Sequence, residues 1–256
     1  MTKLLLIDST SGLKALLSQD FILLILGTVL ISAGGYIIND YYDIKIDVVN
    51  KPEKVQIDRS ITRKSALLIH LAITFFVIVC GLFISWKILA VFIFAMSLLW
   101  FYSNQLKRLP LVGNITIGFL TALVLVIVEI HYQSGNYKLY LFAFFAFFST
   151  IIREIIKDME DIKGDKIHGC NTLPIAIGIL KTKTVIYLII VIFSLSALFI
   201  LRIVDLYLFI FFVGVIMPYY SWLAYKLYRA DTTKSFQQLT KYSKLIMLIG
   251  LLGMFL

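Results

Sequence analysis

The sequence predicts an all-α protein, a bundle of about eight membrane-spanning helices that forms one domain over residues 1–256. Two observations support this prediction. Hydrophobic residues make up 60% of the chain and charged residues only 15%, whereas soluble domains carry about 25% charged residues. The apolar residues also gather into runs close to the roughly 20 residues that a helix needs to cross a bilayer. These features exclude a soluble enzyme, a nucleic-acid-binding protein and a disordered chain.

The expected spans follow one another along the whole chain without an intervening soluble segment. They lie at about 21–38, 66–86, 88–103, 111–131, 138–153, 183–201, 203–226 and 240–256. The first and fifth runs lead into polar segments that can continue the same helix. Residues 1–20 contain Lys3, Asp8, Lys14 and Asp20. These charges interrupt any long apolar run, so we expect neither a signal peptide nor a further span there.

The basic residues predict the orientation of the chain. The formal net charge is +9, from 24 Lys and Arg against 15 Asp and Glu. Most of the basic residues fall in four alternate connections and their flanks, at 39–65, 104–110, 154–182 and 227–239. By the positive-inside rule these connections face the cytoplasm. We therefore expect an integral protein of the cytoplasmic membrane with both chain ends outside.

Two aspartate triplets with the same spacing follow the first and fifth runs. They are Asp40, Asp43 and Asp47, and Asp158, Asp161 and Asp165. On a helix, offsets of 0, 3 and 7 fall within an arc of about 60°. Three aligned carboxylates repel one another, so we expect a positive group beside each triplet. Mg²⁺ suits this position, because it commonly bridges one or two carboxylates to substrate phosphates. The alternative is two solvated acidic helix ends neutralised by nearby Lys and Arg, which the repetition of the motif disfavours.

Several basic side chains lie close enough in sequence to act with these triplets. Lys107 and Arg108 form a short basic segment that either contacts phosphate or anchors the loop at the membrane surface. Arg153 and Lys157 precede the second triplet. They either offset its charge or bind a leaving diphosphate.

Two further arginines either bind phosphate or anchor the chain at the membrane surface, and several tyrosines are candidates for the reacting centre. Arg59 and Arg63 form either a phosphate clamp or a pair of interfacial anchors. Tyr41, Tyr42 and Tyr102 are placed to face a reacting centre, where aromatic rings stabilise a cation. The cysteines Cys80 and Cys170 show no metal-binding spacing.

The two motifs and the segment between them resemble a known family. NDYYDIKID (39–47) and REIIKDMEDIKGD (153–165) resemble the two aspartate-rich motifs of the UbiA superfamily of intramembrane prenyltransferases, and YSNQLKR (102–108) is similar to the basic loop between them. With TLP at 172–174, the second motif is most similar to the geranylgeranylglyceryl-phosphate geranylgeranyltransferase branch. Family members usually have nine spans, and we identify none before the first motif. The segment 51–66 also departs from the family's Arg-Pro-rich loop.

The resemblance implies a helical bundle with a central cavity open to the cytoplasmic side, and an Mg²⁺-dependent transfer of a prenyl chain from a prenyl diphosphate to a lipophilic acceptor. It implies that the six aspartates are the metal ligands, with Asp40, Asp43, Asp161 and Asp165 catalytic. The implied diphosphate-binding residues are Asn39, Lys107 and Arg108, to which the residue pattern adds Tyr102, Arg153, Lys157, Arg59 and Arg63.

The leading functional prediction is transfer of a geranylgeranyl chain to geranylgeranylglyceryl phosphate. One alternative is prenylation of an aromatic quinone or haem precursor. Another is an ion- or phosphate-linked transporter, although its carboxylates should lie at mid-membrane rather than at helix ends. An inactive structural relative is the third. The expected partners are the two substrates and membrane lipid, with no nucleic acid and no obligate protein partner.

Overall fold

A computed structural model describes residues 17–255. Every regular element in these residues is helical, apart from an isolated bridge between Ile57 and Ile61. The all-α prediction is confirmed. Most of the segment 1–20, for which no span was expected, lies outside the described residues.

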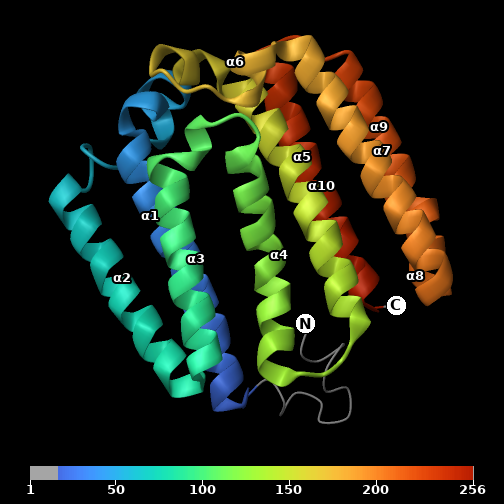
Figure 1. Ribbon diagram of the computed structural model, residues 1–256. Coiled ribbons are helices and arrows are strands. Elements are labelled where there is room, and N and C mark those ends of the chain that lie inside the picture. Colours follow the sequence, from blue (N-terminus) through green and yellow to red (C-terminus); the bar gives the residue numbers. More distant parts are fainter. Residues whose placement is uncertain (1–16, 256) are drawn as a thin grey trace.

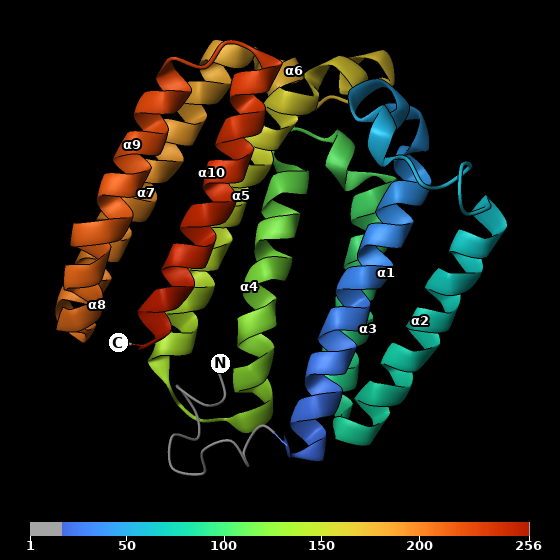
Figure 2. The same ribbon diagram turned by 180° about the vertical axis from the view of Figure 1, so that it is seen from behind.

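Long helices make up the bundle, and Figures 1 and 2 show that successive helices run in alternate directions with their connections at opposite ends. The long helices are α1 (Gln19–Asn50), α2 (Arg63–Ile84), α3 (Trp86–Asn104), α4 (Val112–Tyr132), α5 (Tyr137–Ile167), α7 (Ile179–Val204), α9 (Met217–Tyr228) and α10 (Thr233–Leu252). The shorter elements are α6 (Leu173–Ile177), α8 (Leu206–Phe211), the π-helical turn η5 (Phe212–Ile216) and the 3₁₀ turns η3 (Pro52–Lys54), η4 (Leu106–Arg108) and η6 (Gly253–Phe255).

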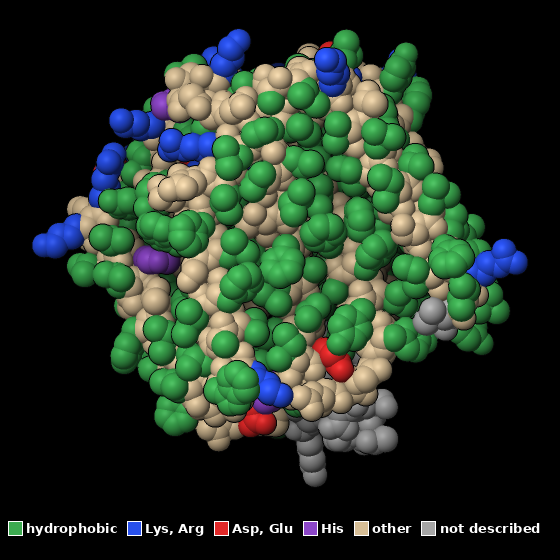
Figure 3. Space-filling model, in the orientation of Figure 1, with side chains coloured by type: hydrophobic (Ala, Val, Ile, Leu, Met, Phe, Trp, Pro, Cys, Tyr) green, Lys and Arg blue, Asp and Glu red, His purple; other side chains and the backbone are tan. Residues whose placement is uncertain are grey.

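Seven helical segments among the described residues are long and apolar enough to cross a membrane, with α8, η5 and α9 counted as one. The eighth expected span falls on α10, which begins at Thr233 rather than near 240 and is polar in its first turns. Large apolar side chains such as Phe83, Leu195 and Phe199 remain 63% to 73% exposed. Figure 3 shows hydrophobic side chains spread over the bundle's outer face, as a lipid-facing surface requires.

Side-chain caps set several of the helix starts. Thr62, Ser85, Asn136 and Asp205 each accept a hydrogen bond from a backbone N–H in the first turn of α2, α3, α5 and α8. Thr232 and Ser235 form a reciprocal capping box at the start of α10. These caps satisfy N–H groups that lack a partner within the helix.

Two hydrophobic cores hold the bundle together. One joins α5 to α7, α9 and α10 around Ile155, Phe193 and Tyr220. The other joins the four helices α1, α2, α3 and α4 around Val77, Ile88 and Phe92.

The helices α1 and α5 are much longer than the membrane core requires. They have 32 and 31 residues, or about 48 Å at 1.5 Å per residue, whereas the hydrocarbon core is about 30 Å thick. Both aspartate triplets lie on their last turns, as the run-on of the first and fifth apolar segments predicted. The extra helix length therefore carries the polar residues beyond the apolar segments.

Candidate active site

A polar cavity of about 360 Å³ lies between the last turns of α1 and α5, with η4 and the start of α4 on a third side. Its walls include all six aspartates of the two triplets, together with Asn39, Tyr102, Lys107 and Lys157. The helical spacing of each triplet turns its three carboxylates to one side. The structure therefore places the two motifs on facing walls of the same cavity, although they are more than 100 residues apart in sequence.

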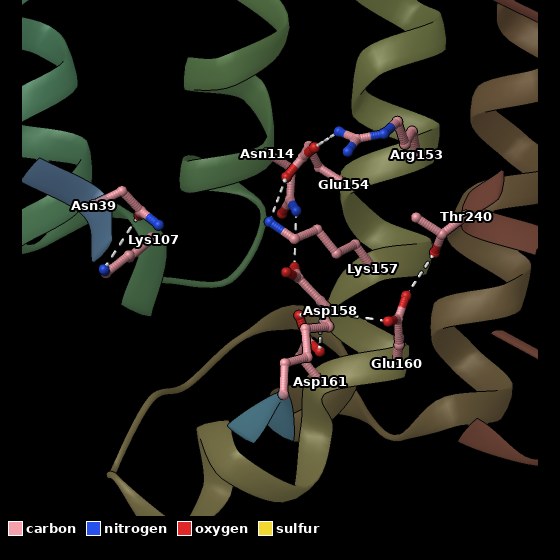
Figure 4. Close-up of polar contacts among 11 residues, drawn as sticks. Asn39, Lys107, Asn114, Arg153, Glu154, Lys157, Asp158, Glu160, Asp161 and Thr240 are labelled. Carbon is pink, nitrogen blue, oxygen red and sulfur yellow. Dashed lines mark hydrogen bonds and ion pairs between the residues drawn. The ribbon is translucent and has the colours of Figure 1, made fainter. Parts of the chain in front are cut away.

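Lys107 lies against the first triplet. Its Nζ is 2.5 Å from Oδ1 of Asp43 and 3.4 Å from Oδ1 of Asn39, and Figure 4 shows its approach to Asn39 from the η4 turn. Burial lowers the pKa of Lys107, an effect that the charge and hydrogen bond of Asp43 partly offset. A buried ammonium group at this position is available to an anion in the cavity.

Lys51 occupies the same position toward the second triplet. Its Nζ contacts both carboxylate oxygens of Asp161, at 2.7 and 2.8 Å, and Oε1 of Glu160 at 3.3 Å. Sequence reasoning did not select this residue, because a lysine just after a helix end is usually solvated. Only the approach of α1 to α5 makes it part of the site.

The neighbouring Asn50 fixes this approach. Its side chain accepts a hydrogen bond from the backbone N–H of Gly164 at 2.8 Å and donates one to the backbone carbonyl of Asp161 at 2.9 Å. A Cβ on Gly164 would lie only 2.5 to 2.6 Å from the Asn50 side chain. Glycine inside a helix lowers helix stability, so Gly164 was the available sequence signal for this contact.

Two further polar residues of the cavity wall, Asn114 and Thr172, differ in their hydrogen bonding. Asn114, near the start of α4, donates from Nδ2 to Oδ2 of Asp158 at 2.8 Å. Thr172, which sequence reasoning did not select, is 4% exposed, and its Oγ1 has no hydrogen-bond partner within the described residues.

A second cavity of about 710 Å³ adjoins the first and is mainly apolar. The two share Tyr36, Asn39, Tyr102 and Lys157 as wall residues. The second cavity extends along α1, α3, α4, α5 and α10, past Phe92, Ala95, Leu120 and Leu248 among others. A molecule with a polar head and a long apolar chain can therefore occupy both cavities at once.

Arg153 and Glu154 line the apolar cavity rather than the polar one. The Nη1 of Arg153 pairs with Oε1 of the buried Glu154, whose other oxygen lies 3.7 Å from Nζ of Lys157. Figure 4 shows Glu154 between the two cationic groups. Arg153 and Lys157, which were expected to offset the charge of the second triplet, therefore contact Glu154 first. Lys157 lies at the boundary between the two cavities.

Three predicted phosphate contacts need correction. Arg59 and Arg63 line neither cavity. Both are exposed, and Asp58 holds the Arg63 guanidinium at 2.7 Å. Arg108 is also exposed and is not a wall residue, because the 3₁₀ turn directs neighbouring side chains apart and only Lys107 enters the cavity.

The donor set is suited to Mg²⁺ acting together with a substrate. No group of three or more His, Cys, Asp or Glu side chains in residues 17–255 is arranged to hold a metal ion by itself. The six aspartates instead line a shared polar cavity as hard oxygen donors. Mg²⁺ typically takes one or two carboxylates and completes its coordination with water and substrate phosphates, so this arrangement fits that ion.

Comparisons with known proteins find relatives over most of the chain. The chain is 34% identical over 244 residues to a digeranylgeranylglyceryl phosphate synthase of Methanobrevibacter smithii, an alignment that covers 91% of this chain and 84% of the relative. It is 36% identical to the enzyme of the same name from Methanosphaera stadtmanae, with 89% and 85% covered.

Solved structures share the fold. A structure of digeranylgeranylglyceryl phosphate synthase matches with a TM-score of 0.71 and 25% identity over 92% of this chain and 84% of that one. A UbiA homologue from Archaeoglobus fulgidus, bound to DMAPP and Mg²⁺, matches with a TM-score of 0.64 and 16% identity over 92% and 88%. The family model described as the UbiA prenyltransferase family matches residues 9–248. The chain therefore belongs to the UbiA prenyltransferase family.

Proposed function

We propose that this protein transfers a geranylgeranyl chain from geranylgeranyl diphosphate to geranylgeranylglyceryl phosphate. The observation that carries the proposal is the pair of aspartate triplets on facing walls of a polar cavity that adjoins a large apolar one. The names of the two relatives described above support the choice of acceptor over an aromatic one. Carboxylates at helix ends, rather than at mid-helix, support an enzyme over a transporter.

Asp40, Asp43, Asp47, Asp158, Asp161 and Asp165 are the residues that would hold Mg²⁺. The ion would neutralise the diphosphate and stabilise the charge that develops on it as it leaves. The Mg²⁺ and DMAPP bound to the A. fulgidus homologue support the choice of this ion.

The protein's own side chains have three tasks in this proposal. Lys107 and Lys157 present ammonium groups to the departing diphosphate. Tyr36 and Tyr102 lie at the junction of the cavities, where their ring faces stabilise positive charge on the allylic carbon. The apolar walls exclude water from that carbon, so the acceptor hydroxyl is the nucleophile within reach. Its proton passes to the released diphosphate as the new C–O bond forms.

The basic loops also bear on the orientation of the protein in the membrane. The loops at the aspartate-bearing end contain most of the lysines and arginines, so by the positive-inside rule this end faces the cytoplasm. Residues 1–256 form one domain in this proposal, since the family match runs from residue 9 to residue 248.

The test uses the purified protein in lipid nanodiscs. It is incubated with geranylgeranyl diphosphate and, in turn, with geranylgeranylglyceryl phosphate, a hydroxybenzoate, a naphthoate or haem, with Mg²⁺ or with EDTA. We expect Mg²⁺-dependent formation of a doubly prenylated glyceryl phosphate, identified by mass spectrometry. Product formation only with an aromatic acceptor, or equal rates in EDTA, contradicts the proposal.

A further inference from the structure

One face of α5 brings polar side chains into the apolar cavity. Thr150, Arg153, Glu154 and Lys157 lie at offsets of 0, 3, 4 and 7 along the helix, so they share one face, and all four line this cavity. Lys244, on α10, lines it as well. The walls near α5 and α10 therefore combine three cationic side chains with a single carboxylate.

The charges of this group do not balance among themselves. Glu154 is 5% exposed, and Arg153 and Lys157 both direct a nitrogen toward it. Its single charge matches one of the two cations, and Lys157 also lines the polar cavity beside the aspartates. An Arg guanidinium also carries five N–H donors in a planar fork, so the contact with Glu154 uses only part of its capacity.

Thr150 supplies an independent sign of a ligand. It is 2% exposed, and its Oγ1 has no hydrogen-bond partner within the described residues. Buried hydroxyl groups normally have a partner. The residue lies in the cavity wall one turn from Arg153, where a rotation of the side chain would bring the hydroxyl to a bound oxygen.

We propose that Thr150, Arg153 and Lys244 bind the phosphate monoester of the acceptor lipid, with Lys157 left to the donor diphosphate. This inference rests on the proposed function. A phosphate monoester carries between one and two negative charges near neutral pH, which suits a guanidinium and an ammonium group on the wall of one cavity, and Arg binds phosphate with two parallel hydrogen bonds. The acceptor's apolar chain would then lie along the apolar wall near Leu248.

The position of the group separates it from the site of the donor diphosphate. Thr150, Arg153 and Lys244 line only the apolar cavity, whereas the aspartates line only the polar one. Arg153 precedes Asp158 by five residues, which is about 7.5 Å along a helix axis. That spacing allows two phosphate-bearing groups to be held at once, with the glycerol hydroxyl between them at the junction.

Two variants test the site without removing the buried pair of Arg153 and Glu154. Lys244→Met removes one cation. Thr150→Val replaces the hydroxyl group, which has no hydrogen-bond partner within the described residues, by a methyl group. We expect Lys244→Met to raise KM for geranylgeranylglyceryl phosphate about 10-fold to 100-fold, the range for a lost charged hydrogen bond. Thr150→Val should raise it about 2-fold to 10-fold. In both variants KM for geranylgeranyl diphosphate should stay unchanged.

Lys241→Met is the matched control, because Lys241 is an exposed lysine on the same helix that lines neither cavity. The same acceptor without its phosphate is the second control, and its KM should be equal in all four proteins. Equal KM values for the phosphorylated acceptor in wild type and Lys244→Met overturn the inference. So does a similar rise of KM for both forms of the acceptor.

A binding measurement separates failure of this inference from failure of the proposed function. Radiolabelled geranylgeranylglyceryl phosphate is bound to nanodisc-embedded protein without donor. Retention by wild type and Lys241→Met, but not by Lys244→Met, supports the site even if no product forms. No retention by wild type, or complete displacement by millimolar inorganic phosphate, overturns a lipid headgroup site, and the second result indicates a site for free phosphate instead.

Discussion

The Asn50 side chain and the backbone of Gly164 join the two aspartate-bearing helices at the polar cavity. The Gly164 N–H donates to Oδ1 of Asn50 at 2.8 Å, and Nδ2 of Asn50 donates to the carbonyl of Asp161 at 2.9 Å. Asp47 lies one turn before Asn50, and Asp161 and Asp165 flank Gly164. This contact therefore sets the separation of the two triplets.

Gly164→Ala should disrupt this separation. The added methyl group would lie 2.5 to 2.6 Å from the Asn50 side chain, so Asn50 must turn away and lose both hydrogen bonds, or the helix ends must move apart. We expect prenyl transfer to fall at least about 10-fold, because a displacement of about 1 Å at a reacting site can reduce rates 100-fold. Gly214→Ala is the control, since a Cβ there meets nothing within 4 Å. Wild-type rate and Mg²⁺ dependence in Gly164→Ala would show that the contact is not needed.

Asp43→Asn and Asp161→Asn should each reduce prenyl transfer about 100-fold to 1,000-fold, the range seen when a group that stabilises developing charge is removed. Both carboxylates line the polar cavity. Rates are measured over a Mg²⁺ titration, in which the variants should also need more Mg²⁺.

Asp58→Asn is the control for those two substitutions. Asp58 lines neither cavity and pairs with the exposed Arg63. Its φ of 70° is left-handed, a conformation that Asn tolerates. The rate should therefore stay within about 2-fold of wild type, and a loss matching that of Asp43→Asn would refute the assignment of the site.

Ala95→Phe should shorten the prenyl chain that the enzyme accepts. Ala95 on α3 is 7% exposed and lines the apolar cavity, so a phenyl ring there fills space along the chain's path. We expect the preference among diphosphate donors to move from geranylgeranyl toward geranyl, measured as kcat/KM for each. Ala90→Phe, at an exposed position of the same helix that lines neither cavity, should keep the wild-type preference. An unchanged preference in Ala95→Phe would place the prenyl chain elsewhere.

Asp205→Asn should lower stability in a pH-dependent way. Burial alone would raise the pKa of Asp205, but hydrogen bonds from the Leu208 N–H, Lys138 and Tyr137 outweigh it, and the pKa is lowered. Its stabilising contribution is therefore complete above the unfolded-state value of about 4 and is lost as the pH falls through the lower folded-state value. We expect a loss of about 1 kcal/mol at pH 7, because Asn can still cap the Leu208 N–H but loses the ion pair with Lys138.

The measurement for Asp205 is the unfolding midpoint of wild type and variant in nanodiscs between pH 3 and pH 7. The difference between the two proteins should be constant down to about pH 4 and then narrow. A difference that grows as the pH falls would contradict the sign of the shift.

Local pattern determined much of this molecule. Runs of apolar residues near membrane thickness predict the helices, since a backbone in lipid must satisfy its hydrogen bonds internally. The repeated spacing in NDYYDIKID and DMEDIKGD predicts carboxylates on one face of each helix, because offsets of 3 and 7 follow the helical period.

Only the tertiary structure decided which side chains meet. Lys51 and Asn50 are 110 and 114 residues from the α5 groups they contact, and no local pattern encodes such a distance. The same holds for Lys107, which enters the cavity while its neighbour Arg108 stays exposed. Sequence alone determined the helices and the faces that carry charge. The packing of α1 against α5 determined the site, because a binding cavity is formed by surfaces that come together only when the chain folds.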